Sequence, residues 1–245
     1  MCPVTEEEVI GLTKSLKGKP TAGYDVIPKS LVKQCIQLIK RPFAHIYNVL
    51  LNSGIFPDEW KTAKVKPLYK KGDRYDMCDY RPISIIPVFA KLLERLMYNR
   101  IISFLCENKI FKEAQHGFRK FKCIETDVQS FIEMIQEALD KQVYTIGTFI
   151  DLTKACDVLN HKLLLEKLFC YSIKGSTDSW FRSYLISRSQ FFEINQSDSS
   201  SVTVNGYRSS STKIKQGVPQ GSVLGPLLFL LFINYLPLNI HGDMI

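Results

Sequence analysis

The sequence predicts an α+β fold, with helices first and a mixture of strands and helices later in the chain. Several long segments place apolar residues at helical spacing. Shorter runs toward the C-terminus alternate apolar and polar residues, as half-buried strands do. The 45% apolar and 23% charged fractions are ordinary for a folded protein, and 245 residues suffice for one large domain or two small ones.

The first part of the chain is predicted to be mostly helical. Thr5 and Glu8 form a capping-box pattern ahead of an apolar helical face. Further helical spacing occurs in three segments, at residues 27–51, 89–105 and 125–139. Gly54 ends the first of these. Residues 64–73 alternate apolar and basic positions before a turn, which predicts a half-exposed strand leading into a basic loop.

The second part is predicted to mix strands with helices. The apolar run over residues 143–150 predicts a strand that ends at Asp151. Helices are expected at residues 161–169 and 180–186, and short strands at 190–195, 202–205 and 212–215. Gly217 opens a turn into an apolar helix over residues 223–232.

The charge, the apolar runs and the cysteines indicate which kinds of partner and which cellular compartment to expect. A net charge of +8, from 32 basic and 24 acidic residues, suits a polyanion such as nucleic acid or an anionic membrane. The longest apolar run is interrupted at Gly225 and Pro226 and falls short of the roughly 20 residues of a membrane span. Seven cysteines without metal-ligand spacing, and no secretory signal, predict reduced thiols in an intracellular protein.

Asp151 is the first candidate for chemistry. It follows an apolar run, at the point where a buried sheet would meet solvent. A carboxylate in that place can hold a hard cation through oxygen. An aspartate there is also a common turn former or helix N-cap, so this residue alone leaves both readings open.

Residues 216–226 are the second candidate. This segment holds three glycines and two prolines directly before an apolar helix. Because glycine has no side chain, such a backbone can approach a ligand closely. A plain loop that caps the helix would have the same composition, and composition alone does not decide between them.

A compact basic cluster is the third candidate. Lys70, Lys71 and Arg81 lie around a predicted turn. Lysine and arginine are the usual phosphate-binding side chains, arginine through its bidentate fork. A solvated charged loop would show the same cluster.

Taken together and in this order, the segments resemble the reverse transcriptase domain of non-LTR (LINE-type) retrotransposons. The resemblance covers nearly the whole chain. The matching segments are residues 68–73, 79–84, 115–119, 149–155 and 217–229, and residues 23–28 fit the family's opening.

The resemblance implies a right-hand polymerase fold and a two-metal reaction. The fingers and N-terminal helices would be residues 1–140, and residues 141–245 would form an incomplete palm, with the thumb absent. A primer 3′-hydroxyl would attack the α-phosphate of a dNTP opposite an RNA template, with two Mg²⁺ ions as cofactors. The implied partners are the RNA template, the DNA primer and the dNTP, with no membrane, and the nucleus is a compatible compartment.

The resemblance also assigns roles to single residues. Asp151 matches the first metal-binding aspartate, and the Leu152 carbonyl would be a backbone ligand. The expected nucleotide-binding residues are Lys70, Lys71, Arg81, Cys156, Gln220 and Gly221. The expected template, primer or structural supports are Arg119, Asp157, Gly225 and Pro226.

Two departures from the family pattern bear on activity. The sequence does not show the aromatic-Ala-Asp-Asp hairpin that would complete the two-metal site. We therefore expect that this polypeptide alone does not polymerise. Cys156 stands where the family carries an aromatic residue that blocks the ribose 2′-hydroxyl. It predicts weakened discrimination against ribonucleotides, and mutational decay is the other reading of that position.

Two other functions compete with a reverse transcriptase. The same elements could form a non-catalytic nucleic-acid-binding remnant, which would bind RNA in a salt-sensitive manner without adding nucleotides. A polymerase that copies RNA into RNA shares the first aspartate, but the Val-Pro-Gln-Gly-Ser text at residues 218–222 argues against it.

Overall fold

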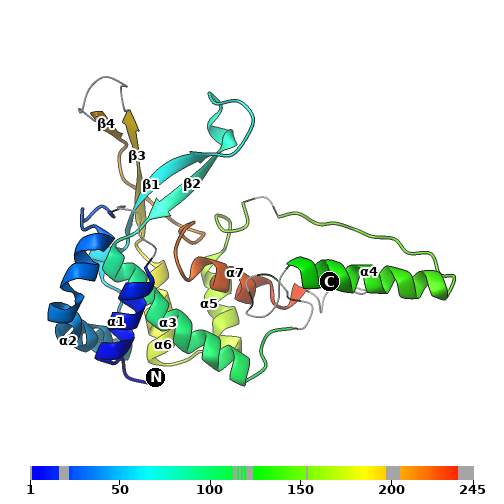
Figure 1. Cartoon of the computed structure of the whole chain (residues 1–245), viewed down its shortest axis with the longest axis horizontal. Coiled ribbons are helices and arrows are strands. Elements are labelled where there is room, and N and C mark those ends of the chain that lie inside the picture. The colour runs from blue at the N-terminus through cyan, green and yellow to red at the C-terminus, as the bar shows by residue number, and fades with distance from the viewer. Residues whose placement is uncertain are drawn as a thin grey trace.

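A computed structural model describes residues 2–16, 22–112, 115, 117, 119, 124–152, 154–196 and 205–236 of the chain. Runs of helices and runs of strands follow one another along the described residues, and the strands form one mixed sheet, consistent with the predicted α+β class (Figure 1). The helices are α1 (Glu6–Ser15), α2 (Lys29–Ser53), α3 (Val88–Glu107), α4 (Ile124–Asp140), α5 (His161–Cys170), α6 (Ser176–Leu185) and α7 (Gly225–Ile233). The strands are β1 (Thr62–Tyr69), β2 (Tyr80–Ile85), β3 (Ser189–Gln196), β4 (Asn205–Arg208) and β5 (Thr212–Lys213).

The predicted helix start at Thr5 is confirmed, but the Glu8 carboxylate pairs with Arg100 instead of the Thr5 backbone. The Thr5 hydroxyl accepts a hydrogen bond from the Glu8 backbone N–H at 3.1 Å and so caps α1. The Glu8 carboxylate does not close the capping box. It forms a two-pronged ion pair with Arg100 of α3, both N···O distances being 3.0 Å. The side chain therefore ties α1 to α3.

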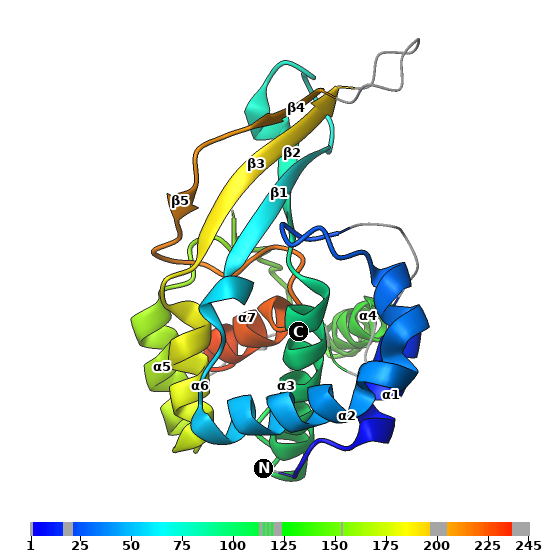
Figure 2. The ribbon, with the colours of Figure 1, turned by 90° about the vertical axis from the view of Figure 1, so that its left-hand side faces the viewer.

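The sheet joins strands that are distant in the sequence. Its order is β2-β1-β3-β4, with β5 also paired to β3. β1 runs antiparallel to β2 and parallel to β3, with Thr62 opposite Ser189. Figure 2 shows this sheet standing above the helices. The predicted division at residue 140 stays a prediction, and the sheet takes strands from both sides of it.

The helices below the sheet share one core. α7 is apolar on nearly all sides, and Figure 2 shows it between α3 and the α5–α6 pair. An aromatic cluster of Phe56, Trp180 and Tyr184 closes the core beneath β1 and β3, with ring centroids 5.1–5.4 Å apart. Among the described helices, none combines the length and apolar character needed to cross a bilayer.

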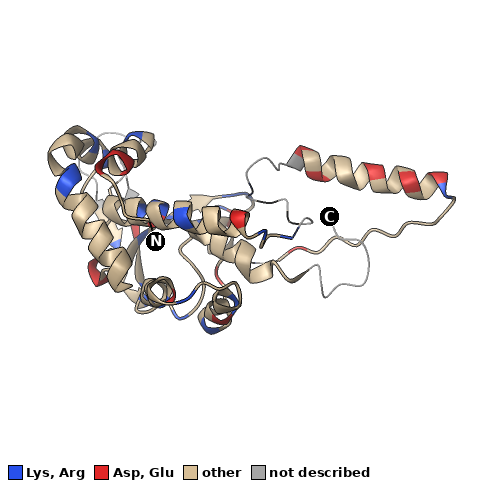
Figure 3. Cartoon of the chain, turned by 90° about the horizontal axis from the view of Figure 1, so that it is seen from below, with Lys and Arg blue, Asp and Glu red and all other residues tan. Residues whose placement is uncertain are grey.

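The prediction of a strand over residues 143–150 was wrong. This segment has no regular secondary structure, and Ile146 and Phe149 are 92% and 85% exposed. A strand exists through its ladder of hydrogen bonds, and no described residue pairs with this one. The segment instead returns alongside α4, which projects from the body and carries acidic but no basic residues (Figures 1 and 3). The predicted strand at residues 202–205 lies almost entirely outside the described residues.

Substituting alanine for Gly54 should measurably change the free energy of unfolding. It ends α2 with a φ of +70°, and a Cβ there would lie 2.7 Å from the Ser179 Cβ in α6. We expect Gly54→Ala to lower the free energy of unfolding by about 1–3 kcal/mol, because strain and crowding add. Gly11 of α1 has open space around its Cβ position, so Gly11→Ala should raise stability by about 0.5–1 kcal/mol. Urea unfolding measures the free energy of unfolding of both variants. A change of the same sign in the two variants would contradict this account.

Candidate functional site

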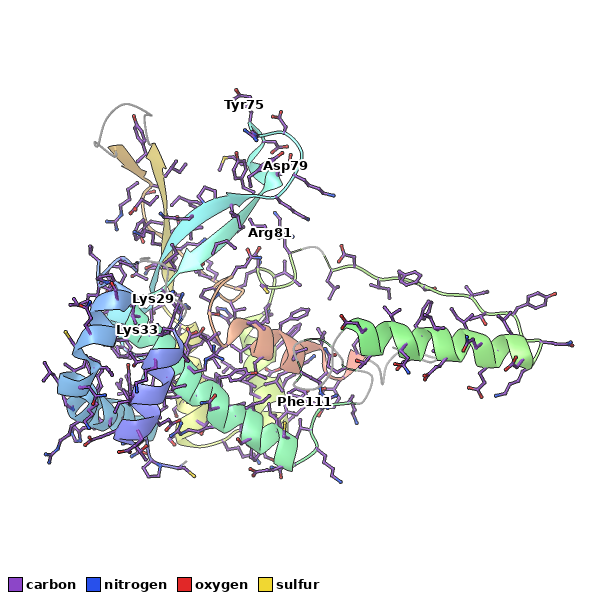
Figure 4. All side chains as sticks on the ribbon, viewed as in Figure 1. Lys29, Lys33, Tyr75, Asp79, Arg81 and Phe111 are labelled. Carbon is purple, nitrogen blue, oxygen red and sulfur yellow. The ribbon has the colours of Figure 1, made fainter. Side chains whose placement is uncertain are left out.

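The β1–β2 hairpin carries the predicted phosphate-binding residues. Arg81 lies on β2 opposite Leu68, and Lys70 and Lys71 follow the end of β1. All three basic side chains are exposed, and Figure 4 shows Arg81 on the hairpin above the helices. The structure therefore groups these cations on one hairpin, where an anion could reach them.

The Gly/Pro-rich segment docks against the same hairpin. The Ser84 backbone N–H of β2 donates to the Gln220 carbonyl at 2.7 Å. Gly221 has a φ of +109°, and a Cβ there would lie 2.9 Å from the Ser84 carbonyl oxygen. Only glycine fits this close approach without strain. Gln220 and Gly221 are thus fixed beside the strand that carries Arg81, as the sequence prediction requires for one shared site.

The other end of the segment docks against the turn that follows Asp151. The Gly217 N–H donates to the Leu159 carbonyl at 2.7 Å, and the Val218 N–H donates to the Cys156 carbonyl at 2.9 Å. Gly217 has a φ of +83°, and a Cβ there would lie 2.6 Å from the Asp157 carbonyl oxygen. These contacts bring residues 156–159 next to residues 217–218, about 60 positions apart in the chain.

Cys156 is half-buried in the turn that follows Asp151, and Asp157 beside it is exposed, with its carboxyl partly desolvated. Burial raises the pKa of the Cys156 thiol, and the neighbouring Asp157 raises it further. Burial also raises the pKa of the Asp157 carboxyl, while Lys154 opposes that shift. A thiol with a raised pKa stays protonated and is a poor nucleophile. Both influences on the Cys156 pKa therefore favour the protonated thiol.

A buried carboxylate holds the middle of the Gly/Pro-rich segment. Glu94 of α3 is fully buried and accepts a hydrogen bond from the Val223 N–H at 2.6 Å. It accepts a second from the Tyr184 hydroxyl at 3.0 Å. Burial raises the pKa of Glu94, and the positive charge of Arg188, itself fully buried, opposes that shift. Glu94 thereby links α3, α6 and the segment.

The sequence patterns did not single out Glu94. It stands among Leu92, Leu93 and Leu96 on the buried face of α3. A lone carboxylate at core positions of a helix is the signal that could have drawn attention to it, because buried charges are rare unless paired. Its partners come from distant segments, so the helical pattern alone could not identify them.

The start of α7 is fixed by residues that the sequence predicted as supports. The Gly225 N–H donates to the Ser222 hydroxyl at 3.0 Å, and a Cβ on Gly225 would lie 2.8 Å from that oxygen. Pro226 occupies the first turn of α7, where its missing N–H costs nothing. Farther along, the Tyr171 hydroxyl donates to the Leu231 carbonyl at 3.0 Å. α7 is thus held near both of its ends.

The remaining predicted residues lie apart from this assembly. Arg119 donates to the carbonyls of Lys112 and Gln115, at 2.9 and 3.0 Å, and so supports its own loop. Asp151 and Leu152 are exposed in the extended segment that follows α4. The described residues contain no group of three potential metal ligands. They therefore do not make up a complete two-ion site, although Asp151 offers the oxygen chemistry that Mg²⁺ prefers.

Comparison with known proteins identifies the class. Residues 69–244 match the family described as reverse transcriptase (RNA-dependent DNA polymerase), so the chain belongs to the reverse transcriptase family. The chain is similar to the RNA-directed DNA polymerase from mobile element jockey of Drosophila melanogaster. The two are 33% identical over 238 residues, or 96% of this chain and 24% of that protein.

Two further relatives are also encoded by mobile elements of Drosophila melanogaster. The probable RNA-directed DNA polymerase from transposon BS is 33% identical over 96% of this chain and 25% of its own length. The one from transposon X-element is 30% identical over 88% of this chain and 23% of its own length. The chain spans about a quarter of the length of these relatives. The resemblance to non-LTR retrotransposon polymerases is confirmed.

The Glu94 network predicts an order of stability losses. Glu94→Gln removes the negative charge facing buried Arg188, and we expect a loss of about 3–5 kcal/mol. Tyr184→Phe removes one buried hydrogen bond, with an expected loss of about 1–2 kcal/mol. Glu7→Gln, on the exposed face of α1, should change stability by less than about 0.5 kcal/mol.

Chemical unfolding of the three variants checks this order. If Glu94→Gln cost no more than Tyr184→Phe, the charge of Glu94 would not be what stabilises the network.

Proposed function

We propose that this chain forms the nucleotide- and template-binding part of an RNA-directed DNA polymerase. The main support for this proposal is that Gln220 and Gly221 dock on β2, the strand that bears Arg81. A backbone that approaches closely and an exposed guanidinium beside it are two features that suit a nucleoside triphosphate site. Family membership supports the same conclusion.

The triphosphate would be held by the hairpin. Arg81, together with Lys70 or Lys71, would neutralise the phosphate charge, because these exposed cations lie on the strand beside the Gly/Pro-rich segment. Arginine can grip two phosphate oxygens at once, whereas lysine acts as a point charge. Gln220 and Gly221 would frame the sugar and base of the nucleotide.

The ribose would face the turn at residues 154–159. Cys156 is close to the framing segment through its carbonyl contact with Val218. Its side chain is smaller than the aromatic residue that the family carries there, which leaves room for a 2′-hydroxyl. Asp157, Gly225 and Pro226 would support this arrangement without touching the nucleotide, and Arg119, in its separate loop, would support the template or primer.

Asp151 and Leu152 are the proposed donors for a divalent metal ion. The family generally uses divalent ions, and the Asp151 carboxylate with the Leu152 carbonyl would be the oxygen donors for Mg²⁺. Bound metal would activate the primer hydroxyl and stabilise the leaving pyrophosphate.

The macromolecular partners would be an RNA template and a DNA primer. A net charge of +8 favours a polyanion. We place residues 1–140 as the fingers and 141–245 as part of the palm, with the nucleus as the compatible compartment. A reading as a binding module that never takes up a nucleotide remains the alternative outcome of the test.

Arg81 supplies that test. We measure equilibrium binding of the next complementary dNTP to the chain on an RNA template–DNA primer, in Mg²⁺. Arg81→Ala should weaken dNTP binding about tenfold or more, because a charge-assisted hydrogen bond is worth about 1.5–3 kcal/mol. Arg41→Ala, at an exposed arginine of α2, is the matched control and should bind dNTP like the wild-type chain.

Two outcomes would oppose the proposal. Salt-sensitive RNA binding with no dNTP uptake would favour the binding module. Equal losses in Arg81→Ala and Arg41→Ala would mean that Arg81 holds no triphosphate.

A further inference from the structure

The loop between β1 and β2 is held in shape by its own carboxylates. Asp73 accepts a hydrogen bond from the Tyr75 N–H at 2.9 Å, and Asp76 accepts one from the Cys78 N–H at 2.8 Å. Asp79 accepts one from the Asp73 N–H at 2.7 Å. Each carboxylate is turned toward the loop backbone. The loop therefore has a defined shape without any ligand.

Two of the three tyrosines in this region also face the loop backbone. The Tyr69 hydroxyl donates to the Gly72 carbonyl at 2.7 Å, and the Tyr80 hydroxyl donates to the Arg74 carbonyl at 2.8 Å. Their rings meet edge to face, with centroids 5.5 Å apart. The Tyr69 and Tyr80 side chains therefore stabilise the end of the hairpin.

The third tyrosine faces the solvent. Tyr75 is 96% exposed, and Met77, two positions later, is 81% exposed. Figure 4 shows Tyr75 at the tip of the hairpin, directed away from the helices. A single exposed apolar residue is ordinary on a protein surface. Here one ordered loop exposes both an aromatic ring and a thioether, while Tyr69 and Tyr80 donate to its backbone.

The surroundings of Tyr75 are basic. Lys70, Lys71, Arg74 and Arg81 all lie exposed on this hairpin. The hairpin from Thr62 to Ile85 carries six basic and three acidic residues, so its net charge is +3 with all three aspartates ionised. An aromatic ring beside cations is the combination that binds unpaired bases, because the ring stacks on a base while the cations meet the phosphates.

We propose that Tyr75 and Met77 form a stacking platform for unpaired bases of single-stranded RNA. This inference rests on the proposed function, because the RNA would be the template strand ahead of its duplex with the primer. Tyr75 would stack on one base, and Met77 would pack against its neighbour. The platform adds affinity without reading the sequence, since every base has a stacking face.

Binding of a labelled RNA–DNA duplex to the full chain tests the proposal. One probe carries a 5′ RNA extension of about six nucleotides, within the usual site size of such surfaces. A second carries the same extension with abasic positions, and a third is blunt. Tyr75→Ala should weaken binding of the first probe about 5- to 100-fold and leave the other two unchanged. Tyr75→Phe should bind like wild type, because it keeps the stacking ring.

Tyr144→Ala is the matched control. Tyr144 is fully exposed but follows the acidic helix α4, so its removal should leave all three affinities unchanged. Equal binding of the first probe by Tyr75→Ala and wild type would overturn the platform while leaving the proposed function standing. An equal loss on the abasic probe would overturn base stacking. If the wild-type chain binds no probe, the proposed function fails and this inference fails with it.

Discussion

The structure depends above all on one buried carboxylate. Glu94 lies on α3, yet its two oxygens bind the Val223 N–H of the Gly/Pro-rich segment and the Tyr184 hydroxyl of α6. Arg188, directly before β3, opposes the burial-driven rise of the Glu94 pKa inside the core. A charge is costly to bury unless it is paired and hydrogen-bonded, so these groups constrain one another's positions. The segment that docks on β2 is thereby tied to the helical core.

The candidate site follows from that constraint together with two glycines. Gly217 and Gly221 let the segment pass within contact of the turn at residue 157 and of β2 at Ser84. A side chain at either position would push the backbone away. Residues from three distant parts of the chain thus meet along one segment. Arg81 adds an exposed positive charge on the strand that borders the segment.

The sequence predicted most elements because their signals are local. The Thr5 cap, the stop at Gly54 and the helical spacing of α2 to α6 act within a few residues, and each was confirmed. The run at residues 143–150 failed because apolar character alone does not supply a pairing partner. The grouping of Gln220 and Gly221 with the Arg81 strand was expected from the family resemblance. Glu94 was missed because its partners are separated from it by about 90 to 130 residues.

Amide hydrogen exchange at Val223, in the chain without ligand, tests the central claim most directly. If Glu94 holds the segment from the core, the Val223 amide should exchange as slowly as amides in the middle of α3. Amides of Lys71, Gly72 and Arg74 in the exposed loop should exchange much faster and serve as an internal reference. A Val223 amide that exchanged as fast as that loop would contradict the account, because the segment would then be open in the free protein.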